Sequence, residues 1–172
     1  MSRRPKRWPR SPPRRGPPRR CWRRWATWSH RGSSVLADQL QAGLSSPICL
    51  TWELTYACNL QCVHCLSASG RRDPDELDTA RALALVDEFA AMQVFYINIG
   101  GGEPLLRRDF FPIVEHAVGS GVGVKFSTNG SLLGREAATR IGSLDYVDVQ
   151  VSLDGVTAEV NDAVRGDGSF AR

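Results

Sequence analysis

The sequence of 172 residues lacks the features of membrane and exported proteins. No stretch approaches the roughly 20 apolar residues that a membrane-spanning helix needs. The arginines at the amino terminus are not followed by the apolar segment of a secretory signal. We therefore expect a cytoplasmic protein that does not associate with a membrane. The chain is long enough to bury the core of one domain.

Acidic residues are absent from residues 1–37, which contain eleven arginines and Lys6. The net charge of +4 therefore combines a segment of +12 with a remainder of −8. This segment has no apolar periodicity, and we predict that it is disordered. Arginine clusters bind phosphates, so a nucleic-acid arm is one interpretation. The alternative is translated sequence upstream of the true start in a GC-rich genome. The acidic remainder favours this alternative, and we do not expect nucleic acid as a partner.

Cysteine is scarce, and none of the five cysteines follows Cys65. Three lie in CNLQCVHC, as Cys58, Cys62 and Cys65, and in a chain without an export signal this spacing favours metal binding. Three thiolates suit an iron–sulfur cluster or zinc, and a [4Fe–4S] cluster usually takes four. A cluster with one open iron position is favoured. The alternative is zinc completed by His64, Cys49 or a distant residue, although Cys49 is predicted to be a small core residue.

Short apolar runs alternate with helical patterns along the rest of the chain. The predicted strands cover residues 48–54, 94–99, 122–127 and 146–152. The predicted helices cover residues 78–92, 110–118 and about 135–141, with Asp78 and Asp109 as N-caps. Such alternation implies right-handed βαβ units and a parallel sheet, hence an α/β fold. In the fourth strand valines alternate with polar residues, which favours a barrel with a polar lumen over an open sheet.

The unusual residues all follow the carboxyl ends of these strands. The cysteines follow the first strand, and GGGEP, STNG and SLDG follow the other three. Each motif alone is typical of a turn, but four on one rim indicate a ligand site. Glycine lets the main chain approach a ligand, Glu103 can accept hydrogen bonds from an ammonium group, and the hydroxyl, amide and carboxylate groups suit a ribose diol. Arg165 can pair with a carboxylate, although a lone arginine near a chain end is more often a surface residue.

CNLQCVHC followed by GGEP, STNG and SLDG resembles the radical S-adenosylmethionine (SAM) superfamily, over about residues 48–170. The resemblance implies that Cys58, Cys62 and Cys65 hold three irons of a catalytic [4Fe–4S] cluster. The fourth iron would chelate the amino and carboxylate groups of SAM. The implied cofactor contacts are Gly101, Gly102 and Glu103 for the methionyl ammonium, Ser127, Asn129, Ser152 and Asp154 for ribose and carboxylate, and His64 for the adenine. Arg165 is counted among these candidates.

A closer resemblance is to the mycofactocin radical SAM maturases, through TWELTYACNLQCVHC, MQVFYINIGGGEP, GVKFSTNG and DYVDVQVSLDG. It implies oxidative decarboxylation of the C-terminal tyrosine of a small precursor peptide and cross-linking of that residue to the neighbouring valine. The reduced cluster would cleave SAM, and the 5′-deoxyadenosyl radical would take hydrogen from the tyrosine β-carbon. The implied partners are the precursor peptide, its small peptide-binding chaperone and an electron donor.

The chain also departs from this family, whose barrel has about six strands and whose C-terminal domain binds auxiliary clusters. We expect about four βα units, the N-terminal part of a (β/α)6 TIM-like barrel, in a truncated chain. The expected organisation is a tail at 1–37, a lead-in at 38–46 and an incomplete radical SAM domain at 47–172. Two alternatives stay open. One is a maturase for a different peptide or small molecule, and the other is a non-enzymatic zinc-binding module with a basic nucleic-acid arm.

Overall fold

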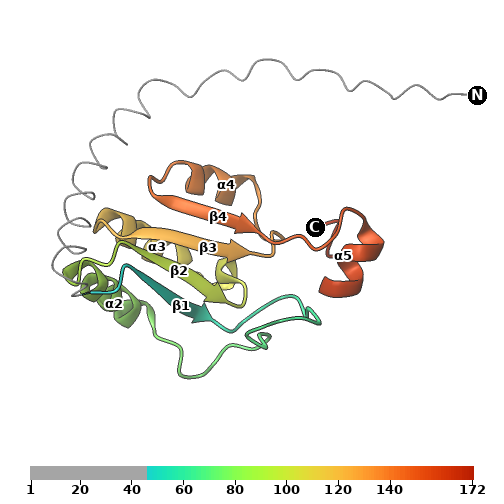
Figure 1. The fold of residues 1–172 in the computed structure, drawn as a ribbon, viewed down its shortest axis with the longest axis horizontal. Coiled ribbons are helices and arrows are strands. Elements are labelled where there is room, and N and C mark those ends of the chain that lie inside the picture. Colours follow the sequence, from blue (N-terminus) through green and yellow to red (C-terminus); the bar gives the residue numbers. More distant parts are fainter. Residues whose placement is uncertain (1–45) are drawn as a thin grey trace, which may run out of the picture. The chain divides into compact units, whose positions relative to one another are not determined.

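The computed structural model describes residues 46–172. The predictions for the arginine-rich segment and for the lead-in up to residue 45 lie outside the described residues. Strands and helices alternate from β1 onward (Figure 1). The strands are β1 (Cys49–Thr55), β2 (Tyr96–Gly101), β3 (Gly123–Thr128) and β4 (Val147–Val151). The helices are α2 (Thr79–Ala91), the 3-10 turn η1 (Pro104–Leu106), α3 (Phe110–Gly119), α4 (Arg135–Gly142) and α5 (Ala158–Arg165).

The four strands form one parallel sheet in the order β1-β2-β3-β4. Trp52 pairs with Ile99, and Phe126 pairs with both Ile99 and Val149, so the strands run side by side in register. Both ends of each strand lie within two residues of the predicted ends. The predicted parallel α/β sheet is confirmed, and its arrangement is that of a partial barrel. Because the strands are parallel, all four carboxyl ends lie along one edge of the sheet (Figure 1).

The apolar core lies between one face of this sheet and the helices α2 and α3. Ile97, Ile99, Val124 and Phe126 alternate along β2 and β3 and are at most 2 % exposed. The helices contribute seven buried side chains, which are Ala82, Val86, Phe89, Phe110, Ile113, Val114 and Ala117. Side chains alternate across a strand, so the intervening residues point to the opposite face.

That opposite face is polar. It carries Thr51 and Glu53 from β1, Asn98 from β2, Lys125 from β3 and Gln150 from β4, none of which is buried. The predicted alternation in β4 places its valines on the apolar face. Val147 and Val149 pack against the core there, whereas Val151 is exposed. In a (β/α) barrel the helices form the outer ring. The polar face lies opposite α2 and α3 and is therefore the face turned toward the lumen.

Some local predictions were wrong. Cys49 is exposed rather than buried, because it alternates with Leu50, the residue that packs against the core. Asp78 caps α2 by accepting the backbone N–H of Arg81, as predicted. Asp109 occupies the N-cap position of α3, as predicted, but its side chain makes no capping hydrogen bond, because its carboxylate is engaged by Arg107 and Thr79 instead.

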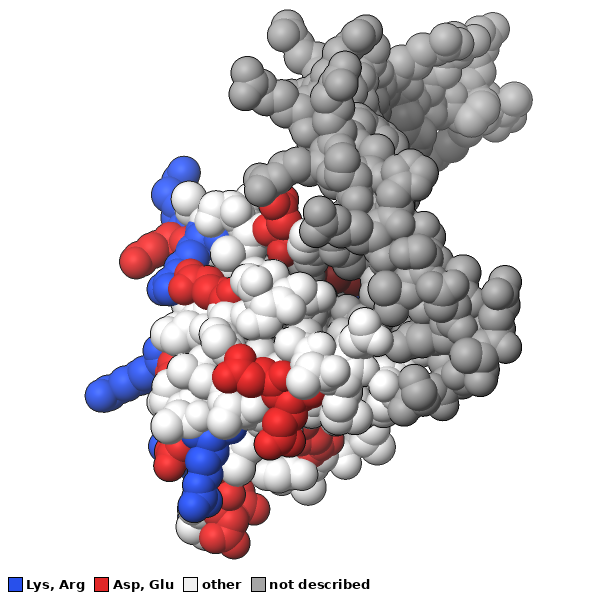
Figure 2. All heavy atoms as spheres, turned by 90° about the vertical axis from the view of Figure 1, so that its left-hand side faces the viewer, with Lys and Arg blue, Asp and Glu red and all other residues white. Residues whose placement is uncertain are grey.

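On the surface at the amino ends of the strands, basic side chains lie along the left edge in Figure 2, and acidic side chains lie both beside them and nearer the middle. No charge of one sign dominates the described part of this face. Among the described residues, no helix has the length and apolar character needed to cross a membrane.

Candidate functional site

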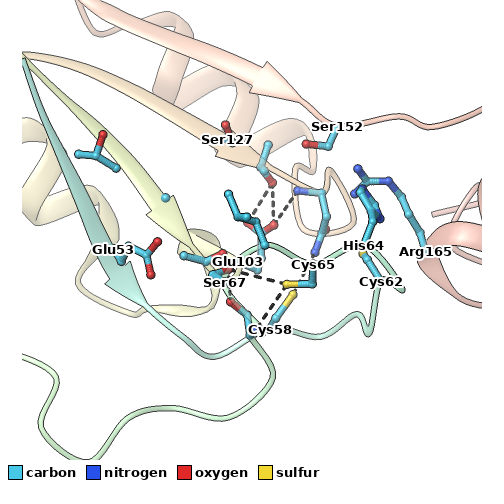
Figure 3. A pocket seen from close by; sticks show the side chains of 18 residues that line it. Glu53, Cys58, Cys62, His64, Cys65, Ser67, Glu103, Ser127, Ser152 and Arg165 are labelled. Carbon is cyan, nitrogen blue, oxygen red and sulfur yellow. Dashed lines mark hydrogen bonds between the residues drawn. The ribbon is translucent and has the colours of Figure 1, made fainter.

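A pocket of about 390 Å³ opens at the carboxyl ends of the strands. Its wall is formed by Thr51 and Glu53 of β1, the segment after β1, the ends of β2 and β3 with the turns that follow them, and Ser152 and Arg165. Eleven of the twelve predicted site residues are among the lining residues, which include Cys58, Cys62, His64, Cys65, Gly101, Gly102, Glu103, Ser127, Asn129, Ser152 and Arg165. Asp154 is the exception. Figure 3 shows the labelled side chains turned toward this hollow from different elements.

The cysteine loop leaves β1 and is closed at its base by backbone hydrogen bonds. The N–H of Gly70 donates to the carbonyl of Tyr56 at 2.8 Å, and the N–H of Cys58 donates to the carbonyl of Gly70 at 3.3 Å. Within the loop the N–H of Cys65 donates to the carbonyl of Cys62 at 3.1 Å. These bonds fold residues 58–65 into a compact turn, which brings three thiols that are separated in the sequence to one wall.

The thiols of this loop differ in their surroundings. The backbone N–H of Ser69 donates to Cys65 Sγ at 3.3 Å, and the Ser67 hydroxyl lies 3.7 Å from the same sulfur. The Ser69 bond lowers the pKa of the Cys65 thiol and so favours the thiolate that binds metals. Burial raises the pKa of the Cys62 thiol, although the positive charge of Arg165 opposes this effect. The four described cysteines are all free thiols.

These donors fit an iron–sulfur cluster. Three free thiols line one pocket, and a cluster is held by thiolates bound to separate irons. Among residues 46–172 no group of three His, Cys, Asp or Glu side chains is arranged around a single metal ion. Cys49, one of the residues considered as a fourth zinc ligand, does not line the pocket.

Close backbone contacts require glycine at both glycine positions of the GGE motif. A Cβ on Gly101, whose φ is +97°, would lie 2.3 Å from the carbonyl oxygen of Thr55. A Cβ on Gly102 would lie 2.1 Å from the carbonyl oxygen of Ala57. The N–H groups of Gly102 and Glu103 donate to these same two carbonyls, at 2.6 and 2.8 Å. At these positions the missing side chain lets the GGE turn approach the end of β1 and the segment after it. The predicted approach to a ligand stays a prediction.

Glu103 is 1 % exposed and binds the turn after β3. Its carboxylate accepts hydrogen bonds from the Thr128 hydroxyl at 2.9 Å and from the N–H of Asn129 at 2.8 Å. It also accepts the N–H of Leu105 at 3.1 Å and so begins η1. Burial raises the pKa of the Glu103 carboxyl, although these donors oppose the effect. The buried side chain thus ties two of the predicted motifs together.

Asp154 is not among the lining residues and joins the cysteine loop to α5. Its carboxylate forms an ion pair with Arg165, and it lies 3.7 Å from Nε2 of His64. Arg165 itself is 9 % exposed and is not a surface residue. The N–H of Val63 donates to the carbonyl of Val164 at 2.9 Å, which adds a backbone link between the same two segments.

Sequence reasoning missed several contributors to this site. Ser67 donates its hydroxyl to the carbonyl of Gly101 at 2.9 Å, and so links the cysteine loop to the GGE turn. Asn161 of α5 is buried and accepts the N–H of Asp154 at 3.1 Å. The hydroxyls that follow Cys65 in CLSAS were a usable signal for Ser67, but helix α5 was not predicted at all.

Comparison with known proteins agrees with the geometry. The radical SAM superfamily pattern matches residues 52–172, which is most of the chain. The chain belongs to the radical SAM superfamily. It is 64 % identical over 135 residues to the mycofactocin maturase MftC of Mycobacterium tuberculosis, covering 78 % of this chain and 34 % of that protein. It is also 39 % identical over 130 residues to an AdoMet-dependent heme synthase of Methanosarcina barkeri, covering 74 % and 37 %.

Among solved structures, SuiB of Streptococcus suis bound to S-adenosylmethionine superposes with a TM-score of 0.67 at 19 % identity. The superposition covers 78 % of this radical SAM chain and 32 % of SuiB, and at this identity it supports the fold alone. SuiB has also been solved with its precursor peptide SuiA. The chain spans about a third of the length of the curated relatives that it matches.

Proposed function

We propose that this radical SAM protein takes part in peptide maturation of the mycofactocin type. The observation that carries the proposal is the convergence of eleven predicted residues on one pocket. The identity of 64 % to a mycofactocin maturase supports the choice of reaction. The proposed substrate is a small precursor peptide whose C-terminal tyrosine is decarboxylated oxidatively and cross-linked to the neighbouring valine. A peptide-binding chaperone and an electron donor are the further proposed partners.

In this proposal Cys58, Cys62 and Cys65 hold a [4Fe–4S] cluster, with SAM bound beside it. When bound, this pair supplies reductive cleavage of the sulfonium and hence a radical able to abstract hydrogen. The contribution of the chain is binding and orientation. The N–H of Ser69 stabilises the Cys65 thiolate, and Arg165 offers its guanidinium to a carboxylate at the pocket wall.

The polar groups of the rim are suited to the rest of the cofactor. Ser127 and Ser152 line the pocket at the ends of neighbouring strands and offer hydroxyls to a ribose. His64 lies in the wall with its side chain 52 % exposed, which leaves a ring face free for an adenine. The Glu103 carboxylate already accepts three donors, so its proposed bond to an ammonium would use the remaining lone pairs.

The test is an anaerobic reconstitution with iron and sulfide, followed by addition of SAM and a reductant. We expect 5′-deoxyadenosine from the unaltered chain, none from Cys62→Ala, and an unchanged yield from Cys49→Ala, the matched cysteine outside the pocket. Addition of a precursor peptide ending in Val-Tyr should then produce a loss of mass equal to CO₂ and two hydrogens. A protein that takes up zinc and no iron would contradict the proposal.

A further inference from the structure

Three polar side chains beside the cysteine loop form a closed cycle of hydrogen bonds. Asn59 Nδ2 donates to the Ser131 hydroxyl at 2.8 Å, and that hydroxyl donates to Asn129 Oδ1 at 2.6 Å. Asn129 Nδ2 in turn donates to Asn59 Oδ1 at 2.9 Å. Asn59 is the neighbour of Cys58 in the sequence, whereas the other two residues belong to the turn after β3. The cycle therefore joins two distant segments directly beside a proposed iron ligand.

The cycle fixes which way the Asn129 amide points. Its Oδ1 accepts both the backbone N–H of Ser131, at 2.9 Å, and the Ser131 hydroxyl. An oxygen is required at that position because both of these groups donate to it. The NH₂ group must then face the opposite side, where it lies 2.9 Å from Asn59 Oδ1 and 4.0 Å from Cys58 Sγ.

The backbone of Asn129 is held as firmly as its side chain. Its N–H donates to the buried Glu103 carboxylate at 2.8 Å, and the preceding Thr128 is 2 % exposed and donates to the same carboxylate. The N–H of Gly130 then donates to the Thr128 hydroxyl at 3.1 Å. Because both the backbone and the amide are fixed, the distance between Asn129 Nδ2 and the Cys58 sulfur is set by the fold.

We propose that Asn59 and Ser131 are positioning residues that hold the Asn129 amide against the Cys58 thiolate, and thereby raise the reduction potential of the bound cluster. This inference rests on the proposed function, because it concerns the cluster that Cys58 would ligate. An N–H donor at a cluster sulfur stabilises the reduced cluster, which is the more negatively charged state. Neither Asn59 nor Ser131 lines the pocket, so both act through Asn129.

The hydrogen bonds of the Asn129 amide also limit what else it can contact. Its amide was predicted to contact the ribose of SAM, but the described bonds commit its NH₂ group to Asn59 and Cys58. Loss of the cycle should therefore change the electronic properties of the cluster more than it changes SAM affinity.

The experiment is a potentiometric titration of the reconstituted, SAM-free protein, followed by EPR of the reduced cluster. The variants are Asn59→Ala and Ser131→Ala, with Ser131→Thr as a conservative variant that retains the hydroxyl. Ser143→Ala is the matched control, because the hydroxyl of that serine donates only to the Arg140 carbonyl at the end of α4. Iron and sulfide content and circular dichroism are measured for each protein, so that a change in potential is compared at equal cluster content and folding.

We expect Asn59→Ala and Ser131→Ala to shift the midpoint potential to more negative values, with Ser131→Thr and Ser143→Ala close to the unaltered chain. Unchanged midpoints in both alanine variants at full cluster content would overturn the inference and leave the proposed function standing. Equal shifts in Ser143→Ala would also overturn it. Failure of the unaltered chain itself to take up a cluster would overturn the proposed function, and this inference with it.

Discussion

The Glu103 carboxylate accepts the hydroxyl of Thr128 at 2.9 Å, a buried bond between two turns that lie 25 residues apart in the sequence. Through it the turn after β2 holds the turn after β3, and both turns contribute to the pocket wall. The two partners are 1 % and 2 % exposed, so water is not available to replace either of them. A buried acceptor that loses its donor keeps the full cost of its desolvation.

Thr128→Val tests this bond, because it replaces the hydroxyl with a methyl group of similar size. We expect the free energy of unfolding to fall by about 1.5–3 kcal/mol, the range for a hydrogen bond to a charged group. Urea denaturation followed by circular dichroism measures the change. Thr139→Val is the control, since the hydroxyl of Thr139 is exposed on α4 and bonds only to the carbonyl of Arg135. An equal loss of unfolding free energy in both variants would show that the buried bond to Glu103 contributes no more than the exposed hydroxyl of Thr139.

The residues of the rim could be predicted from the sequence because the carboxyl ends of parallel strands must share one edge. Each motif needed only its position after a predicted strand, and errors of one or two residues in strand bounds did not move a motif to another edge. The pairings within the rim could not be predicted in the same way. Glu103 with Thr128, and Asn129 with Asn59, depend on the order and register of strands that are distant in the sequence.

Side-chain direction and short helices were the main local failures. Cys49 was assigned to the core because it is a small residue within the first predicted strand. A shift of one residue along a strand reverses the face, and Leu50 is the residue that packs inward. Helix α5 spans eight residues and buries only Asn161 and Arg165. Two polar residues give no apolar periodicity, so the fixed position of Arg165 could not be inferred from the local pattern.

Gly102→Ala should disrupt the site through its backbone. The added Cβ would lie 2.1 Å from the Ala57 carbonyl oxygen, an atom that already accepts the N–H of Glu103. Because backbone must move to relieve this overlap, we expect a loss of at least about 1–3 kcal/mol in the free energy of unfolding. Gly100→Ala is the matched control, since a Cβ there meets nothing within 4 Å. Thermal or urea unfolding should separate the two variants, and similar stabilities would contradict the prediction.

Asp109→Asn should destabilise the protein at neutral pH and much less in acid. Arg107 donates to the Asp109 carboxylate at 2.8 and 2.6 Å, Thr79 donates at 2.8 Å, and these bonds lower the pKa of Asp109 to about 2. In the unfolded chain the pKa returns to about 3.9. The stabilisation is therefore complete above about pH 4 and is lost as the pH falls through about 2.

Urea titrations at pH 7 and pH 3 measure this dependence. We expect the difference in unfolding free energy between Asp109→Asn and the unaltered chain to be smaller at pH 3. Asp148→Asn is the control, because Asp148 has a side chain 73 % exposed and lies 3.7 Å from Lys125. A difference for Asp109→Asn that stays constant between the two pH values would show that the ionised carboxylate is not the source of the stability.

Asp154→Ala should weaken SAM binding without loss of the cluster. Asp154 lies outside the pocket, but its carboxylate pairs with Arg165, which lines the wall and would otherwise have to be ordered by the ligand. We expect SAM affinity to fall by about 5- to 30-fold, which corresponds to one or two kcal/mol. Anaerobic calorimetric titration of the reconstituted protein measures the affinity, and Asp167→Ala, an exposed aspartate near the same helix, serves as the control.

A double-mutant cycle then decides whether Asp154 acts through Arg165. If it does, the Asp154→Ala/Arg165→Ala protein should bind SAM no more weakly than Arg165→Ala alone, because the second residue has nothing left to position. Additive losses would instead mean that Asp154 contacts the ligand itself, as the ribose role implied by the family resemblance requires. The same cycle thus separates a positioning carboxylate from a binding one, although both variants lower the measured affinity.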